Sequence, residues 1–319
     1  MYENNLANKY KAFGFSFSSD ILFPELRDLV SLGGNQIDIE IRYADLFQEW
    51  SENGEIFNRY IFTKDNVMFR LPDLGIFLIK GGRQILVSPD KNASLDQIRL
   101  YVLGTCMGAV LLQRKILSLH GSAIEIDGSA YAIVGESGAG KSTLAASFIK
   151  EGYKLLSDDV IPVVLSENDL PVVIPSYPSQ KLWENSIRDL GMDATLFKPI
   201  YNREKKYSIP VSNFSYKNVP LRGVFELTKT SSDNISLSKL SGLECFKTLT
   251  QHTYRNEFIS KMCLNEWHFK TSSSFLTTIK LYKLSRPINR FSAEQLRSLI
   301  INTISKEINN DQYYENQYV

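Results

Sequence analysis

One eight-residue segment, Gly135–Ser142, has the residue types and the spacing of a phosphate-binding loop. It reads Gly-Glu-Ser-Gly-Ala-Gly-Lys-Ser and fits the pattern GxxxxGK[ST] at every fixed position. In this pattern the glycines let successive backbone N–H groups point inward at an anion, Lys141 reaches the terminal phosphates, and the Ser142 hydroxyl binds Mg²⁺. The segment therefore predicts binding of ATP with Mg²⁺. The residues expected to contact the nucleotide are Gly135, Glu136, Ser137, Gly138, Ala139, Gly140, Lys141, Ser142 and Thr143.

Two neighbouring carboxylates, Asp158 and Asp159, come seventeen and eighteen residues after Lys141. We expect them to close the strand that follows the helix of the loop. Because parallel neighbouring strands end at the same edge of a sheet, the pair would then lie beside the phosphates. One carboxylate could hold Mg²⁺ while the other accepts the proton of an attacking hydroxyl. The alternative interpretation is a surface turn that happens to carry two aspartates.

The elements that must position these residues change in character near residue 94. Before it, short alternating segments predict a β-rich N-terminal α+β domain over residues 1–93. After it, a nearly all-apolar helix from Ser94, with Ser94 as its N-cap, opens an α/β domain over 94–308. Residues 309–319 are polar and are expected to form a flexible tail. The segments predicted as strands are 13–17, 37–43, 67–71, 75–79, 84–87, 119–126, 130–134, 153–156, 161–165, 221–227, 235–240 and 281–284, and those predicted as helices are 94–117, 141–151, 182–190, 245–263 and 293–307.

The charge balance restricts the class of partner. The chain has 36 Lys and Arg residues against 35 Asp and Glu, for a formal charge of +1. This balance argues against a nucleic acid as the partner. The three cysteines form no CxxC pair, and the longest apolar stretch, 100–112, is shorter than the ~18–20 residues that cross a bilayer. Residues 1–13 carry no apolar signal segment. We expect a cytoplasmic protein that acts away from the membrane.

Three segments, taken together, resemble the catalytic core of bacterial HPr kinase/phosphorylases. They are His120-Gly121, the loop Gly135–Ser142, and Gly152–Asp159, and they span about forty residues. The resemblance implies a fold similar to the nucleotide domain of phosphoenolpyruvate carboxykinase. It also implies that Asp158 is the general base that deprotonates an acceptor serine, that His120 lies close to it, and that Asp159 supports the metal together with Ser142. Without the resemblance, His120 would be read as a core residue on an apolar strand.

Some positions depart from the pattern of that family. Thr143 stands where the family has Glu after the loop, and only Arg222-Gly223 remains of its E-x-R-G-x-G segment, whose Glu helps to hold the metal. Glu184 and Glu226 are candidate replacements for that Glu. The glycine-rich segment associated with binding of HPr is also missing, which puts HPr in doubt as the acceptor.

A closer resemblance is to the HPr-kinase-like proteins encoded with clusters for ribosomally made peptides. It rests on residues 10–15, 18–26 and 179–183. It implies a serine kinase that phosphorylates the C-terminal serine of a lasso-peptide precursor. Two alternatives stay open, an HPr(Ser) kinase/phosphorylase and a nucleotide-gated binding or sensor module without transfer activity, and a homo-oligomer is also left open.

A basic stretch, 198–217, is the last candidate. It carries five cations against the single acid Glu204, and it would serve as a lid over phosphates or an acidic peptide, or else as a solvated loop. The cations are Lys198, Arg203, Lys205, Lys206 and Lys217.

Overall fold

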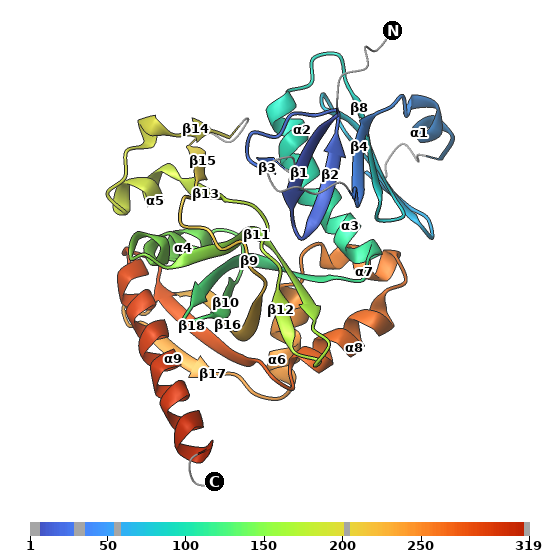
Figure 1. Ribbon diagram of the computed structural model, residues 1–319. Helices are drawn as coiled ribbons and strands as arrows, with labels where there is room; N and C mark the ends of the chain where they lie inside the picture. Colours follow the sequence, from blue (N-terminus) through green and yellow to red (C-terminus); the bar gives the residue numbers. More distant parts are fainter. Residues whose placement is uncertain (1–6, 29–35, 54–58, 201–204, 316–319) are drawn as a thin grey trace.

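The computed structural model describes residues 7–28, 36–53, 59–200 and 205–315. The N-terminal part forms a sheet of eight strands in the order β3-β1-β2-β4-β8-β7-β6-β5, seen at the upper right of Figure 1. Burial alternates along β4, as the sequence predicted for residues 37–43, whereas β7 is buried at every residue from Gly75 to Ile79. The elements are β1 (Asn8–Ala12), β2 (Phe15–Ser19), β3 (Arg27–Asp28), β4 (Ile39–Tyr43), α1 (Phe47–Asn53), β5 (Tyr60–Phe62), β6 (Asn66–Leu71), β7 (Gly75–Lys80) and β8 (Gln84–Pro89).

The turn between β1 and β2 joins the N-terminal sheet to the rest of the molecule. Phe13 and Gly14 both have positive φ, so the predicted strand over 13–17 begins only at Phe15. The N–H of Phe13 donates to the carbonyl of Ser176 (3.1 Å), and a Cβ on Gly14 would lie 2.9 Å from Ile174. Glycine at this position therefore permits close packing of the two parts.

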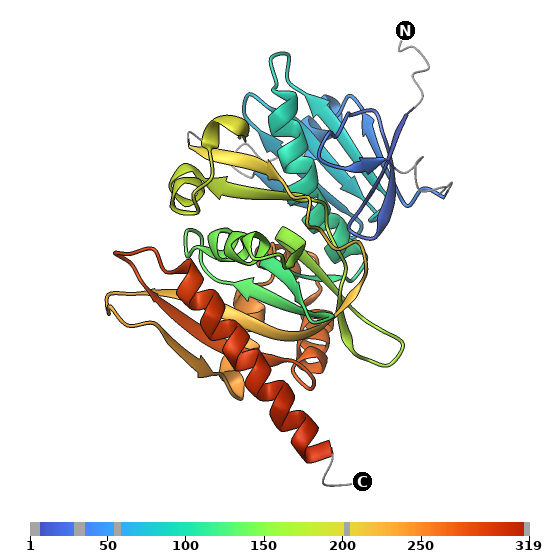
Figure 2. The same ribbon diagram turned by 60° about the vertical axis from the view of Figure 1, so that its left-hand side comes forward.

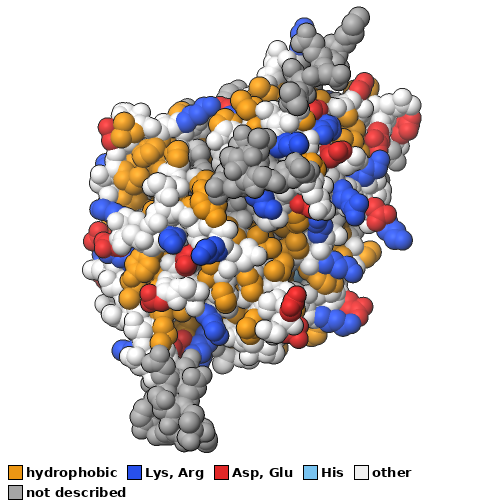
Figure 3. Space-filling model, viewed as in Figure 1, with side chains coloured by type: hydrophobic (Ala, Val, Ile, Leu, Met, Phe, Trp, Pro, Cys, Tyr) orange, Lys and Arg blue, Asp and Glu red, His pale blue; other side chains and the backbone are white. Residues whose placement is uncertain are grey.

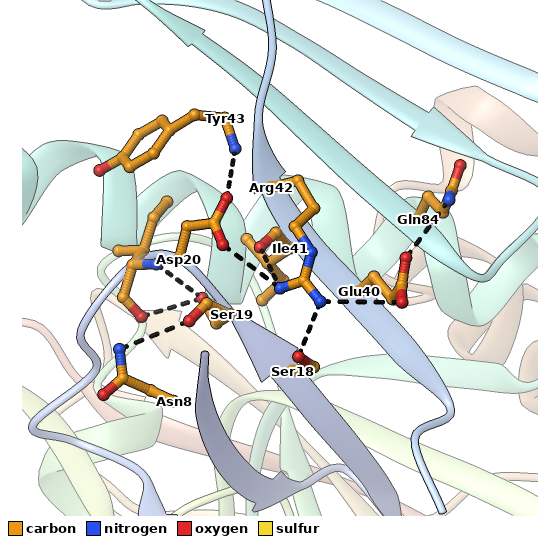
Figure 4. A network of polar contacts seen from close by, with 10 residues as sticks. Asn8, Ser18, Ser19, Asp20, Glu40, Ile41, Arg42, Tyr43 and Gln84 are labelled. Atoms are coloured by element: carbon orange, nitrogen blue, oxygen red, sulfur yellow. Dashed lines mark hydrogen bonds and ion pairs between the residues drawn. The ribbon is translucent and has the colours of Figure 1, made fainter. Parts of the chain in front are cut away.

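A polar network holds β2 beside β4, which run parallel (Figure 4). Arg42 Nη2 donates to Ser18 Oγ (2.8 Å), and Asp20 Oδ2 accepts the N–H of Tyr43 (3.1 Å). Parallel neighbours lack a hairpin turn to set their register, so these side-chain contacts stabilise it. Over the face seen in Figure 3, basic and acidic side chains are interspersed, in keeping with the balanced composition.

One continuous helix lies across the N-terminal sheet (Figure 2). It consists of α2 (Leu95–Tyr101), a π-helical turn (Val102–Cys106) and α3 (Met107–Gln113). Its 19 residues have a mean hydropathy of 1.3, enough in length and composition to cross a membrane, but two thirds of that stretch is buried against the sheet. We interpret it as a core helix. Ser94 precedes the helix in an extended conformation, but its side chain makes no capping hydrogen bond, contrary to the prediction.

The larger unit is built on a seven-stranded sheet in the order β10-β9-β11-β12-β16-β18-β17, in which β10 also pairs with β16. Helices α4 and α9 cover one face, and α6 and α8 pack on the other. The strands are β9 (Leu117–Ile126), β10 (Ser129–Val134), β11 (Lys154–Leu165), β12 (Pro171–Val173), β16 (Val219–Thr230), β17 (Ser236–Lys239) and β18 (Lys280–Pro287). The helices are α4 (Lys141–Lys150), α6 (Leu243–Gln251), α7 (Asn256–Lys261), α8 (Asn265–Phe275) and α9 (Ala293–Glu315).

A small sheet lies above α4, at the upper left of Figure 1. It contains β13 (Ser179–Trp183), β14 (Lys198–Pro199) and β15 (Lys206–Pro210), and it is accompanied by α5 (Glu184–Asp189) and a 3₁₀ turn (Ala194–Leu196). The helix predicted over 182–190 therefore begins later, because the preceding residues pair with β15.

Further boundaries differ from the prediction. Residues 154–165 form one strand, β11, where two short strands were expected. Helix α9 continues past its predicted end at Glu307 to Glu315, so the predicted tail is helical through that residue, and residues 316–319 lie outside the described part of the chain.

Candidate active site

The register of three neighbouring strands brings the P-loop (Gly135–Ser142) level with the two aspartates. Val134, the last residue of β10, pairs with Gly121 of β9, and Gly121 pairs with Asp159 of β11. The predicted proximity is confirmed, but the predicted reason is wrong. Strands β10 and β11 are not neighbours, because β9 lies between them and runs antiparallel to both. The aspartates also lie in the middle of β11, not at its end.

Three glycines with positive φ shape the P-loop. They are Gly135 (147°), Gly138 (76°) and Gly140 (106°). A Cβ on Gly135 would lie 2.4 Å from the carbonyl oxygen of Leu227 on β16, so no side chain fits there. The helix α4 starts at Lys141, so its first N–H groups face the loop, as an anion site requires.

The Lys141 ammonium lies inside the loop that precedes it. Its Nζ donates to the carbonyls of Gly135 (2.8 Å) and Glu136 (3.0 Å). Burial lowers the pKa of Lys141, while Asp159 and Asp158 act in the opposite direction. A buried cation satisfied only by backbone carbonyls is well placed to exchange them for phosphate oxygens.

Asp158 is a buried carboxylate with both oxygens hydrogen-bonded. Ser122 Oγ donates to Oδ1 (2.6 Å) and the N–H of Lys181 donates to Oδ2 (3.0 Å). Only 3% of the residue is exposed, and burial raises the pKa of Asp158 above its ordinary value in spite of these two donors. A raised pKa makes this carboxylate the better proton acceptor of the pair.

Asp159 has the opposite electrostatic environment. Its Oδ2 lies 2.8 Å from Lys181 Nζ, and its Oδ1 lies 3.5 Å from His120 Nδ1. Burial acts to raise the pKa of Asp159, but Lys181 and then His120 outweigh it and hold that pKa well below its usual range. The backbone of Asp159 is left-handed (φ 82°), and its carbonyl oxygen lies 3.0 Å from His120 Nδ1. Two adjacent carboxylates thus differ strongly in proton affinity, which is typical of acid–base sites.

The resemblance implied that His120 lies close to Asp158, and in the structure its ring contacts the next residue, Asp159. His120 lies on β9 between Leu119 and Gly121, beside Asp159, and burial lowers its pKa while Asp159 acts to raise it. Burial thus opposes the charged form of the imidazole, whose Nδ1 is directed to Asp159.

A central cavity of about 770 Å³ joins these groups. The P-loop residues Ser137, Gly138 and Gly140–Thr143 line one side, and Gly104, Thr105 and Tyr254 line another. Of the residues predicted to contact nucleotide, Gly135, Glu136 and Ala139 do not line the cavity. Thr143 Oγ1 lies 2.7 Å from Ser186 Oγ, so it is tied to α5 as well.

Four residues of this site were not singled out from the sequence. They are Ser122, Lys181, Tyr254 and Arg286. Ser122 follows His120 by two residues on the same strand face, and Lys181 lies within the segment 179–183 that carried the second resemblance, so local signals existed for both. Arg286 Nε donates to the carbonyl of Ala139 in the P-loop (2.6 Å) from the end of β18, and no local pattern pointed to it.

The two candidate glutamates are placed differently. Glu226 on β16 pairs with Val134 directly before the P-loop, and its Oε1 lies 3.0 Å from His252 Nε2. Glu184 opens α5 and does not line the cavity. Arg222 lies near the other end of β16, away from the P-loop. Of the two, Glu226 is therefore the acid closer to the loop.

The basic stretch 198–217 contributes to the cavity through Lys206, which lies with Ile200 in its wall. Lys198 instead pairs with Asp96 (2.9 Å) on the outside. Arg203 and Glu204 lie outside the described residues, and Lys205 and Lys217 are exposed.

The residues present are suited to a metal carried by a nucleotide. Within the described ranges, no three His, Cys, Asp or Glu residues are grouped so as to hold a metal ion without other ligands. Mg²⁺ in phosphoryl-transfer sites takes one or two protein oxygens and completes its shell with phosphates and water. The Ser142 hydroxyl and the Asp159 carboxylate, both in the cavity wall, supply oxygens of that kind.

Comparison with known proteins points to the same region. Residues 113–192 match the family model of the HPr Serine kinase C-terminal domain. This segment contains His120, the P-loop and both aspartates. The chain is 26% identical over 199 residues to the HPr kinase/phosphorylase of Mycoplasmopsis pulmonis, covering 52% of this chain and 62% of that protein.

Other HPr kinase/phosphorylases match over fewer residues but with a higher sequence identity. The HPr kinase/phosphorylase of an Azoarcus species is 41% identical over 75 residues (23% of this chain, 22% of that protein), and that of Clostridium botulinum is 35% identical over 74 residues (23% of each). In each case the chain spans less than two thirds of the relative. The solved structure of the Hpr(Ser) kinase/phosphatase from Coxiella burnetii matches with a TM-score of 0.35 and 15% identity, covering 62% of this chain and 96% of that one. The sequence matches support the resemblance to HPr kinase/phosphorylases, and none of them bears on lasso-peptide clusters.

Proposed function

We propose that the protein is an ATP- and Mg²⁺-dependent serine kinase that acts on a peptide or small protein. The observation that carries this proposal is the strand register that sets the P-loop level with Asp158 and Asp159, two carboxylates of opposite proton affinity. A module that only binds nucleotide has no need for a buried carboxylate of raised pKa beside the phosphate loop.

A side cavity of about 380 Å³ supports binding of the whole nucleotide. It adjoins the central cavity and shares Gly140, Thr143, Ser186 and Arg286 with it. Ile288 and Phe291, both partly exposed, line it and offer an apolar surface to a purine base. The base would lie there, and the phosphates would follow the P-loop into the central cavity.

The chemistry follows from these positions. The serine oxygen of the acceptor bonds to the γ-phosphorus, the bond from that phosphorus to the β,γ-bridging oxygen breaks, and ADP leaves. Asp158 takes the serine proton. Lys141, Arg286 and the loop N–H groups offset the charge on the transferring group. Ser142 and Asp159 would hold Mg²⁺, and the bound ion would supply further charge compensation.

For Asp159 to serve as a metal ligand, its ion pair with Lys181 must loosen or be shared. Oδ2 is engaged by Lys181 Nζ, whereas Oδ1 has only His120 at 3.5 Å. We therefore assign Oδ1 to the metal and the Lys181 contact to holding the carboxylate in place.

For the acceptor, we propose the C-terminal serine of a lasso-peptide precursor. This proposal is supported by the resemblance of residues 10–15, 18–26 and 179–183 to the HPr-kinase-like proteins of ribosomal peptide clusters. The names of the curated relatives favour HPr as the alternative acceptor.

The test is transfer of labelled γ-phosphate from ATP to candidate precursor peptides, with and without their terminal serine, and to HPr. We expect label on the serine-ended peptides alone. Label on HPr that inorganic phosphate then releases would instead establish an HPr kinase/phosphorylase. ATP binding without any labelled product would favour the sensor module.

A further inference from the structure

A third cavity, which we call the N-terminal cavity, lies on the N-terminal sheet side of the molecule. Its volume is about 840 Å³, and it is formed by the β6–β7 turn (71–74) and by residues 90–94 ahead of α2. Gln97 and Tyr101 of α2 line both this cavity and the central one. The two cavities therefore adjoin at these side chains, and an extended chain in one could continue into the other.

The N-terminal cavity is lined by cations that have no carboxylate partner. Arg59, Arg70 and Lys91 form no ion pair within the part of the chain that the structure describes. Asp73 and Asp90 also line this cavity, so its wall carries both positive and negative side chains. A nucleic acid backbone would meet those two acids unfavourably, whereas a polypeptide with spaced acidic side chains fits this mixture of charges.

The cationic wall continues to the central cavity. Arg255 lines the central cavity together with Glu257, to which it is paired (3.4 Å), and the phenol of Tyr60 is acted on by Arg255, Glu257 and Arg59. Arg255 Cζ lies 5.5 Å from the centroid of the Tyr254 ring, which itself lies 5.7 Å from the His120 ring. A line of groups thus runs from Arg59 through Arg255 and Tyr254 to the imidazole beside Asp159.

One approach to Asp158 is taken by the proposed nucleotide site. On the side of the P-loop and Arg286, the central cavity adjoins the side cavity that we assign to the nucleotide base. The π-helical turn places Gly104 and Thr105 in the opposite wall, and a Cβ on Gly104 would come within 3.2 Å of the Tyr254 hydroxyl. Glycine at position 104 therefore lets the Tyr254 hydroxyl pack close to the π-helical turn.

We propose that the N-terminal cavity is the groove for the acceptor polypeptide. The acceptor chain crosses α2, its hydroxyl lies in the central cavity, and acidic side chains that precede the acceptor residue meet Arg59, Arg70 and Lys91. This inference rests on the proposed kinase function, and it gives the N-terminal sheet a role in selecting acidic acceptors.

The test measures peptide binding directly, without ATP. The probe is a fluorescein-labelled peptide of about twelve residues, long enough to cross both cavities at ~3.4 Å per residue, with several spaced glutamates and one C-terminal serine. Its Kd is measured by anisotropy for the wild type and for the double variant Arg70→Glu/Lys91→Glu. The matched control is Lys80→Glu, an exposed cation at the far end of β7 from the cavity.

We expect the double variant to bind the peptide about tenfold more weakly, with the loss reduced at high salt. Lys80→Glu should change the Kd less than about twofold, and binding of an ATP analogue should be the same in all three proteins. A peptide with glutamine in place of glutamate should bind weakly to all of them. The proposed groove is refuted if the wild type and the double variant bind the peptide equally. It is also refuted if Lys80→Glu loses as much peptide affinity as the double variant.

The same proteins separate this inference from the kinase proposal. If no protein transfers phosphate and the binding difference persists, the kinase function is refuted and the acidic groove is supported. If the wild type and the double variant phosphorylate the peptide with the same KM, the kinase stands and the groove is overturned.

Discussion

Replacing each aspartate by asparagine in turn should affect the stability of the protein very differently. Asp158 is buried and its charge is disfavoured by burial, so Asp158→Asn removes a charge that costs folding free energy at neutral pH. The amide oxygen can still accept from Ser122, although the N–H of Lys181 loses its acceptor. We expect the free energy of unfolding to change by no more than about 1 kcal/mol.

Turnover should respond much more strongly in this variant. Loss of a general base costs about 10²–10⁴-fold in rate, which corresponds to ~2.7–5.4 kcal/mol of transition-state stabilisation at 1.36 kcal/mol per tenfold. Affinity for an ATP analogue should be unchanged, because neither oxygen of Asp158 is assigned to the nucleotide. Single-turnover transfer and a titration with the analogue measure the two quantities separately.

Asp159→Asn should destabilise the protein instead, because it leaves the Lys181 ammonium without its carboxylate. The Lys181 and Asp159 side chains are 15% and 28% exposed. Their pair therefore lies between fully buried pairs, which cost about 3–5 kcal/mol to break, and surface pairs, worth about 0.2–1 kcal/mol. We expect a loss of about 1–3 kcal/mol, seen as a Tm several degrees lower.

The pH dependence of this loss has a definite sign. The folded-state pKa of Asp159 is lowered, so its contribution is complete above the ordinary carboxyl pKa of ~3.9 and declines as the pH falls below it. The gap in unfolding free energy between the wild type and Asp159→Asn should narrow on acidification. Equal destabilisation by both variants, or normal turnover in Asp158→Asn, would refute the division of roles between the two carboxylates.

Three further variants test the site, each by one measurement. Lys141→Ala should weaken binding of an ATP analogue at least tenfold, measured by titration, because the ammonium is the cation within the P-loop. Gly135→Ala should lower Tm by several degrees, since its Cβ would meet the carbonyl of Leu227, and an unchanged Tm would contradict the loop geometry. Ser122→Ala should move the acidic limb of the kcat/KM profile to higher pH, because the Ser122 hydrogen bond lowers the pKa of Asp158 and its removal lets burial raise that pKa further.

Much of the site could be predicted because it depends on local patterns. The P-loop is a contiguous segment whose glycines and lysine have one physical use, and the structure gives Gly135, Gly138 and Gly140 the positive φ that the pattern requires. The strand over residues 130–134 was likewise predicted from its continuous apolar run, and the structure confirms it and the strand over 119–126.

Other features depend on pairing between distant residues, which a single sequence does not reveal. Asp158 and Asp159 lie in the middle of β11. Because polar residues usually mark the end of a buried strand, the sequence predicted two short strands where the structure has one. Arg286 comes to the P-loop because β18 is parallel to β16. The separate helical turn of α7 within the predicted helix 245–263 follows from the left-handed Arg255, a choice set by tertiary packing against Thr105.

The central claim is that the P-loop and the two aspartates act on the same phosphate. A crystal structure with Mg²⁺ and a non-hydrolysable ATP analogue tests it most directly. The account predicts the base between Ile288 and Phe291, the γ-phosphate between Lys141 and Asp158, and the metal on Ser142 and Asp159. A triphosphate that turns away from Asp158, or a metal held by other acids, would contradict it.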